Sequence, residues 1–224
     1  MCGRYVITSS SAQLAALFEA EPRVRLAPRY NVAPTQPVAV VRTDREGGRR
    51  TLDLVRWGLV PWWAKDVKLG NRLINARSET AAEKPAFKAA MRYRRCLVVA
   101  DGFYEWQRRG PVKQPHLIQM ADEQPFAMAG LWEHWQDANG NELETCAILT
   151  TPANAMLSKL HERMPAILEA EDYLAWLDPR QTDAQAAGAL LRPMAAERMM
   201  HHPVSLHVNN PRHDDARCVA PVGG

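Results

Sequence analysis

A succession of short apolar runs through the middle of the chain constrains its fold more than any other feature. The runs are 96–100 (CLVVA), 116–120 (HLIQM), 126–135 (FAMAGLWEHW) and 144–151 (ETCAILTT). Runs of this kind, bounded by turn-forming residues, are typical of buried strands. We therefore predict a β-sheet that extends through the middle of the chain.

The N-terminal residues predict one more strand and a helix. Residues 4–8 (RYVIT) indicate a short strand, and residues 9–20 indicate a helix. Ser10 and Gln13 have the spacing of a capping box, in which each side chain satisfies the other residue's backbone N–H. This spacing places the start of the helix at Ser10.

A hairpin and an interrupted helix come next. Residues 37–41 (PVAVV) and 50–58 (RTLDLVRWG) are expected to be the two strands of the hairpin, with Gly47–Gly48 at its tip. Residues 81–92 have a helical pattern that we expect to break before Pro85 and to restart there, since proline suits the first turn of a helix.

Helical patterns return after the last apolar run, at 155–161, 171–177 and 184–191, and the chain ends in an irregular, extended segment. Strands dominate the middle and helices are segregated from them, which predicts the α+β class. We expect a single domain, 1–224, with a mixed or antiparallel, barrel-like sheet core, flanking helices and long ordered loops.

The composition is ordinary for a globular protein, with 46% hydrophobic and 24% charged residues among 224. A net charge of +3 permits a nucleic-acid partner without requiring one. Cys96 and Cys146 lie within apolar runs and are expected to be reduced core residues. The sequence has no secretory-leader pattern and no apolar run of about 18 residues, so we expect a cytoplasmic protein without membrane contact.

Cys2 follows the initiator methionine directly. Methionine aminopeptidases remove Met1 when the next side chain is small, and cysteine qualifies. The new N-terminus would carry a thiol beside an α-amine, whose pKa is about 7.7–8.0. Such an amine can add to an aldehyde to form an imine, and the thiol can then close a five-membered thiazolidine ring. Chance occurrence of a cysteine at this position is the plainer interpretation.

Three more stretches carry candidate functional residues. Glu105 lies between large aromatics in GFYEW, where desolvation would raise its pKa and allow proton transfer; an ion pair with an arginine is the alternative. Asn75 and Arg77 lie on one face if their segment is extended, where Asn75 could orient an amine and Arg77 could clamp a phosphate. The alternative is that Asn75 forms a turn and Arg77 is a surface charge. His161, in HERMP, is a candidate for proton transfer, although solvent-facing histidines are commoner.

Trp62 and Trp63 are adjacent in a proline-containing loop and cannot both face a core easily. An exposed tryptophan beside basic residues suits stacking on the bases of single-stranded nucleic acid, whereas burial is the default for tryptophan. His201–His202 has no cysteine or acidic partner at ligand spacing, so we predict no metal site there.

Six motifs occur in order along the chain: MCGRY, RYNVAPTQ, WGLVPWWAKD, INARSET, CLVVADGFYEW and HERMP. Together they resemble the SOS response-associated peptidase (SRAP) family, the abasic-site processing proteins. The resemblance runs from Cys2 to about Pro165 and continues weakly through HPVSLHVNN and VAPV. It implies a lyase-like enzyme of the DNA damage response that reacts with abasic sites in single-stranded DNA. The mature N-terminal Cys2 would form a covalent thiazolidine with the lesion aldehyde and shield it.

The resemblance also implies roles for individual residues. Asn75 would orient the Cys2 amine, Glu105 would shuttle protons, and His161 would assist proton transfer, including reversal of the crosslink. The implied DNA contacts are Arg4, Arg77 and Arg163 on phosphates, Pro34, Trp62 and Trp63 against bases beside the lesion, and Thr150 in the same pocket. No metal or organic cofactor is implied, and we expect a monomer that associates with the nucleoid when it binds DNA.

Two other functions fit parts of the sequence. A cysteine peptidase with Cys2 as its nucleophile, which processes its own N-terminus, would need an oxyanion hole and an acyl-enzyme. A non-catalytic single-strand binding module would explain the tryptophans and arginines, but it would leave Cys2, Asn75, Glu105 and His161 without a purpose.

Overall fold

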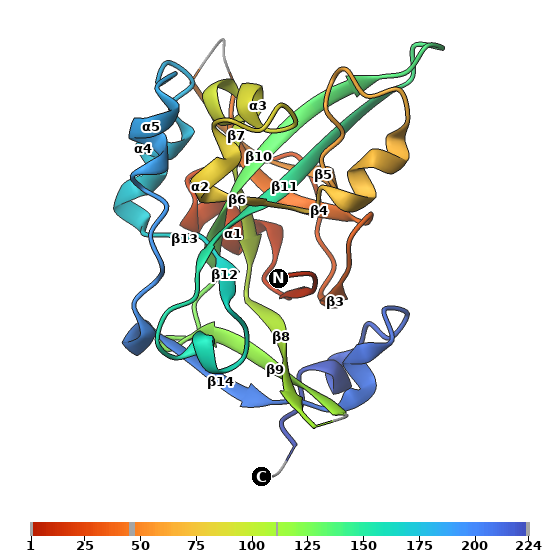
Figure 1. Cartoon of the computed structure of the whole chain (residues 1–224), viewed down its shortest axis with the longest axis vertical. Coiled ribbons are helices and arrows are strands. Elements are labelled where there is room, and N and C mark those ends of the chain that lie inside the picture. The colour runs from red at the N-terminus through yellow and green to blue at the C-terminus, as the bar shows by residue number, and fades with distance from the viewer. Residues whose placement is uncertain (1, 45–47, 111, 223–224) are drawn as a thin grey trace.

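Two β-sheets, of five and nine strands, form the framework of the described chain (Figure 1). The computed structural model describes residues 2–44, 48–110 and 112–222. Five strands of the larger sheet are β4 (Pro37–Thr43), β5 (Arg50–Trp57), β7 (Arg95–Ala100), β10 (Phe126–Gln136) and β11 (Glu142–Pro152). They pair antiparallel in the order β11-β10-β7-β4-β5.

A parallel pairing closes this sheet into a barrel. Arg56 and Trp57 of β5 lie opposite Thr145 and Cys146 of β11, so the two ends of the five-strand order meet. The predicted α+β fold with a mixed, barrel-like sheet is therefore confirmed. Four short strands extend the larger sheet: β2 (Glu21–Pro22), β6 (Asn75–Arg77), β12 (Arg163–Pro165) and β13 (Ile167–Leu168).

The smaller sheet lies at one end of the barrel (Figure 1). Its strand order is β14 (Met199–Pro203), β9 (Val112–Met120), β8 (Gly102–Arg109), β1 (Tyr5–Ile7) and β3 (Arg29–Val32), each antiparallel to its neighbours. β8 follows β7 after a single residue, Asp101, so the chain passes directly from the barrel into this sheet.

One large cluster of buried apolar side chains forms the main core and joins the barrel to its neighbours, since it includes Trp57 of β5, Phe103 of β8 and Trp176 of α4. All six residues of β7 are buried, as its apolar run predicts. Cys96 and Cys146 lie in this core as free thiols, which confirms their predicted role, and burial raises the pKa of Cys96 to about 12.

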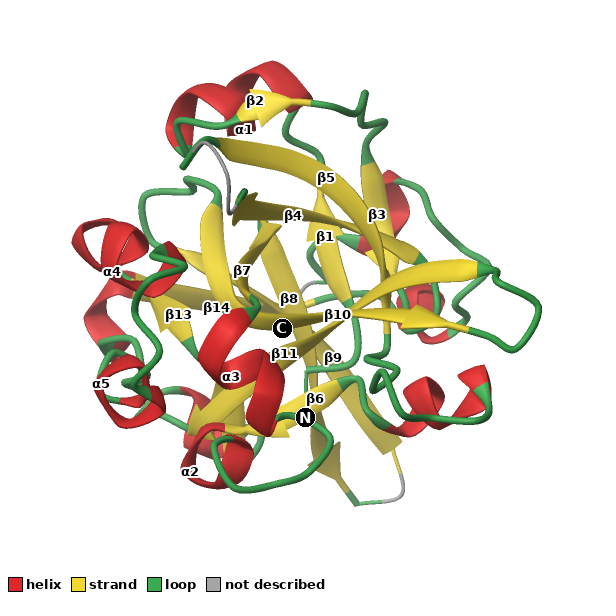
Figure 2. Cartoon of the chain, turned by 90° about the horizontal axis from the view of Figure 1, so that it is seen from above, coloured by secondary structure: helices red, strands yellow, loops and turns green. Residues whose placement is uncertain are grey.

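Short helices surround the strands, as Figure 2 shows from above. The α-helices are α1 (Ser11–Leu17), α2 (Ser78–Ala81), α3 (Lys88–Tyr93), α4 (Tyr173–Leu177) and α5 (Ala184–Gly188). Single 3₁₀ turns lie at η1 (Val67–Arg72), η2 (Leu157–Lys159), η3 (Ala170–Asp172), η4 (Ala196–Arg198), η5 (Leu206–Asn209) and η6 (Ala216–Cys218). None of the helices in the described ranges is long and apolar enough to cross a membrane.

The capping box of α1 is confirmed, because the Ser10 side chain accepts from the Gln13 backbone N–H and the Gln13 side chain accepts from the Ser10 N–H. The predicted hairpin is confirmed as β4 and β5, although Gly47 lies outside the described residues. α3 begins at Lys88 rather than at Pro85, because turns occupy residues 82–87.

One other expectation is wrong. The helix predicted at 155–161 is reduced to η2, because Arg163 must already pair with Pro152 of β11, and the short connection leaves room for only one turn. The segment from 201 onward is extended and then irregular, as expected: it begins within β14, which adds an edge strand to β9, and continues through η5 and η6. β14 has no apolar alternation that would reveal it.

Candidate active site

Cys2 is completely buried at the start of the chain. β1 pairs with β8 through Tyr5 opposite Phe103, and the Tyr104 N–H donates to the Arg4 carbonyl at 2.9 Å. This pairing carries the first residues along β8 toward Glu105. Burial raises the pKa of the Cys2 thiol, and the negative charge of Glu105 raises it further, so the thiol is protonated at neutral pH.

Asn75 contacts Cys2 directly. Its strand, β6, runs parallel to β11 with Asn75 opposite Ile148, and its Nδ2 donates to the Cys2 carbonyl oxygen at 2.8 Å. The Oδ1 atom is buried and has no hydrogen-bond partner among the described residues. This oxygen can therefore accept from a further N–H at the Cys2 backbone. The extended geometry predicted for Asn75 and Arg77 is confirmed, and Arg77 is exposed.

Glu105 lies on β8 and is only 3% exposed. Burial raises the pKa of this carboxyl group, while positive charge nearby, including that of His161, opposes the shift. Burial thus favours the protonated carboxyl group, the form that can donate a proton. The predicted desolvation of Glu105 is thus present in the structure.

His161 follows η2 and faces the same site. Its Nδ1 accepts from the Arg163 backbone N–H at 2.9 Å, which leaves the proton of the neutral ring on Nε2. The ring is therefore held by the backbone with a defined nitrogen as donor. The structure brings Cys2, Asn75, Glu105 and His161 together from four separate parts of the chain.

A cleft with a volume of about 720 Å³ opens beside Glu105 and His161. Its other lining residues are Arg4, Trp106, Gln107, Arg108, Lys113, Lys159, Leu160 and Asn209. The wall is thus strongly basic, which favours a polyanionic ligand. Arg108, Lys113 and Lys159 carry no motif in the sequence; the basic run QRRGPVK was the only signal that could have pointed to two of them.

Arg4 is fixed in the wall of this cleft. Its Nη1 donates to Asn31 Oδ1 at 2.7 Å and to the Val208 carbonyl at 2.9 Å, and its guanidinium lies 5.9 Å from the centre of the Trp106 ring. Burial lowers the pKa of Arg4 without bringing it near neutrality. The side chain thus presents a positive charge in a set position.

Arg163 is engaged within the protein. Its guanidinium forms a two-pronged ion pair with Glu79, and Nη2 also donates to the Thr150 carbonyl at 2.5 Å. The hydrogen bond from Arg163 lowers the pKa of Glu79 to about 2. Thr150 is itself buried and donates to the Ala76 carbonyl at 3.4 Å. A phosphate contact by Arg163, and a lining role for Thr150, stay predictions.

Trp62 and Trp63 are exposed, by 64% and 46%, whereas Trp57 is buried with its Nε1 donating to the Ile74 carbonyl. Pro34 is half-buried in the loop before β4. The two exposed rings fit the expectation that adjacent tryptophans in this loop do not both enter the core. Their contact with bases, and that of Pro34, stay predictions.

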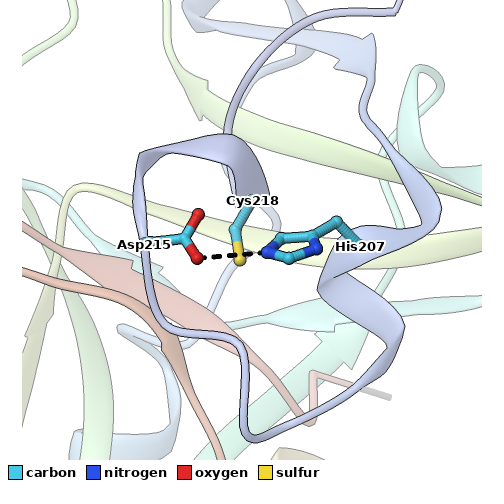
Figure 3. A group of neighbouring side chains, drawn as sticks. All are labelled: His207, Asp215 and Cys218. Atoms are coloured by element: carbon cyan, nitrogen blue, oxygen red, sulfur yellow. Dashed lines mark hydrogen bonds and ion pairs between the residues drawn. The ribbon is translucent and has the colours of Figure 1, made fainter.

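Another group of potential ligand atoms lies in the C-terminal segment (Figure 3). His207, Asp215 and Cys218 place these atoms within 4.8 Å of one another. Asp215 already contacts His207 Nε2 at 3.1 Å, and it accepts from the Arg217 guanidinium at 2.8 and 3.0 Å. The Cys218 thiol donates to the His213 carbonyl, and burial raises its pKa. These contacts account for all three side chains as stabilisers of η5 and η6.

Comparison with known proteins defines the class of this fold and site. The family model of the SOS response associated peptidases (SRAP) matches residues 1–211, and the chain belongs to this family. The abasic site processing protein YoqW of Bacillus subtilis is 40% identical over 98% of this chain and 99% of its own length. The abasic site processing protein HMCES of Gallus gallus is 36% identical over 88% of this chain and 67% of its own length.

The fold is similarly shared with solved structures. A crystal structure of a protein from Bacteroides thetaiotaomicron superimposes with a TM-score of 0.89 at 27% identity, covering 99% of this chain and all of the other. A second, from Bordetella bronchiseptica, has a TM-score of 0.79 at 26% identity, with 92% of this chain covered and 100% of that chain.

Proposed function

We propose that this protein acts on abasic sites in single-stranded DNA and bonds to them covalently through Cys2 once Met1 has been removed. The observation that carries the proposal is the convergence of Cys2, Asn75, Glu105 and His161 beside a basic cleft. Relatives named as abasic site processing proteins, similar over nearly the whole chain, support it. The ring-opened sugar of an abasic site is an aldehyde, the group that an aminothiol captures.

The first step is attack of the Cys2 α-amine on the aldehyde carbon. A C–N bond forms, and the carbonyl oxygen takes up protons and leaves as water, giving an imine. Glu105 supplies a proton to this oxygen, since burial raises its pKa and so favours the protonated carboxyl group. The Asn75 Oδ1 atom, which has no partner among the described residues, can accept from the α-amine and so aim the lone pair of the amine nitrogen at the aldehyde carbon.

The second step closes the ring. The Cys2 sulfur adds to the imine carbon, a C–S bond forms, and the thiol proton passes to the imine nitrogen. Ring closure is favoured because the sulfur and the imine nitrogen belong to the same residue, so the addition is intramolecular. Aldehyde and aminothiol thus become thiazolidine and one water. His161 lies where it can carry the proton by way of Nε2, and it can return a proton to open the ring again.

The basic cleft accounts for recognition of the strand. Arg4 is held rigidly, and Arg108, Lys113 and Lys159 add positive charge to the same wall. Fixed cations bind phosphates with little loss of side-chain entropy, and the exposed Trp62 and Trp63 rings offer stacking surfaces for unpaired bases.

The test compares wild type with Cys2→Ser and Cys96→Ala on an abasic single strand. Wild type and Cys96→Ala should give an adduct that survives heating in denaturant. Cys2→Ser keeps the α-amine but lacks the sulfur, so it should give an adduct only when borohydride reduces the imine. A heat-stable adduct of Cys2→Ser without borohydride would contradict ring closure by the thiol.

A cysteine peptidase remains the competing function, and the family's descriptive name favours it. Peptidase nucleophiles are thiolates, and their pKa is lowered by a nearby cation. Burial and Glu105 raise the pKa of Cys2 instead, which speaks against attack on a peptide bond. Cys2-dependent cleavage of a peptide substrate would reverse this conclusion.

A further inference from the structure

Two histidines lie directly behind Glu105 in the smaller sheet. In the antiparallel pairing of β8 and β9, His116 is opposite Glu105, so both side chains project from the same face. On the next strand, β14, Pro203 is opposite His116 and His201 is opposite Ile118, which brings the two rings together diagonally. His116 is 3% exposed, and His201 is half-buried.

The two rings meet at hydrogen-bond distance. His116 Nδ1 and His201 Nδ1 are 3.1 Å apart, and the ring centres are 5.1 Å apart. Two nitrogens at this distance need one proton between them, so one ring donates and the other accepts. The pair can take up one further proton and stay intact, but a second would set two N–H groups against each other.

Charged groups near the pair lie on neighbouring elements. Glu105 of β8 is opposite His116, His202 of β14 and Lys159 of η2 act on His201, and His161 acts on Glu105. Burial, then His202 and Lys159, lower the pKa of His201, so the pair resists a full positive charge. Glu105 is the carboxyl group in this set, and its ionisation is the event that would favour a proton on the histidines.

We propose that His116 and His201 form a shared-proton dyad that takes up one proton from solvent and passes it to Glu105 after Glu105 has protonated the departing oxygen. The proposal rests on the proposed function of Glu105. The half-buried His201 lets the dyad take up this proton from solvent, and its charge stabilises the carboxylate that remains once Glu105 has given its own proton to the oxygen. When the dyad passes its proton to Glu105, the dyad is neutral again. His116 and His201 touch no substrate, so they are positioning residues.

The first experiment measures the rate of adduct formation against pH for wild type, His116→Gln, His201→Gln and the control His134→Gln. His134 is an exposed histidine of β10. Without the dyad, Glu105 keeps its proton to higher pH. The pH at which the rate of adduct formation falls on the alkaline side should therefore rise by about one pH unit in both dyad variants. It should not move in His134→Gln. A loss of rate that is equal at every pH would show a structural role only and would overturn the dyad.

The second experiment needs no DNA and separates this proposal from the proposed function. The imidazole resonances of His116 and His201 are followed by NMR against pH in the whole protein, in wild type and in Glu105→Gln. The dyad requires that the two rings titrate together, with one added proton, and that Glu105→Gln lowers their midpoint. If the two rings titrate independently, with midpoints that are unchanged in Glu105→Gln, the dyad is refuted even if wild type forms the adduct. An absent adduct with coupled titrations would refute only the proposed function.

Discussion

Glu105 combines two properties that oppose each other at the scale of a residue: it is a charged group by nature, and it is almost completely buried. A carboxyl group whose pKa is higher in the folded chain than in the unfolded chain weakens folding once it ionises. Glu105 does not reduce the free energy of unfolding below the unfolded pKa of about 4.3. It lowers this free energy as the pH rises through the folded pKa. Retaining this residue therefore costs stability at neutral pH.

Glu105→Gln separates stability from reactivity. The variant should resist urea better than wild type at pH 7, and the difference should shrink as the pH falls toward 4, because wild-type Glu105 then becomes neutral. Its rate of adduct formation should fall by about 10²–10⁴, the usual contribution of a positioned proton donor. Denaturation curves at both pH values and timed gel assays measure the two effects. A variant that is less stable at pH 7 and equally fast would contradict this view of Glu105.

At the scale of elements, Arg163 of β12 ties α2 to the barrel through Glu79. Glu79→Gln removes the charge that neutralises Arg163, so Arg163 becomes available to a phosphate. We expect tighter binding of single-stranded DNA. The slope of the logarithm of the binding constant against the logarithm of the salt concentration should steepen by about 0.7, which corresponds to one added phosphate contact. Glu83→Gln, an exposed acid nearby, is the matched control. Equal salt-dependence slopes for both variants would show that Arg163 does not contact a DNA phosphate.

The elements that the sequence predicted well are those with a local signal. β7 is a run of apolar residues and α1 carries its own capping box, so neighbouring residues suffice to define them. β14 and the segment at 155–161 depend on distant partners: β14 exists because β9 offers an edge, and the segment is restricted by the pairing of Arg163 with Pro152. Local patterns contain no information about such pairings.

The same distinction applies to the site. Cys2, Asn75, Glu105 and His161 could be named from motifs, because each lies in a recognisable short stretch. The pairing of His116 with His201 could not, since 85 residues separate them and only the order β8-β9-β14 brings them together. The cleft cations Lys113 and Lys159 were missed for the same reason.

At the scale of the whole molecule, strands of the two sheets hold Asn75 and Glu105 in place while Trp62 and Trp63 stay outside the core. Trp63→Ala should weaken binding of an intact single strand by about 10–100-fold, the loss of one stacked base. Tyr93→Ala, which removes an exposed ring from α3, is the control and should change affinity little. Fluorescence anisotropy at fixed salt measures both. Equal effects would exclude Trp63 as a stacking surface.

The account depends on a free aminothiol at the start of the mature chain. Intact mass spectrometry of the protein mixed with an abasic single strand tests this most directly, because it reports the N-terminus and the adduct in one spectrum. We predict a protein that lacks Met1, and an adduct whose mass is that protein plus the strand minus one water. An adduct that still contains Met1, or one that Cys2→Ala forms equally well without a reductant, would contradict it.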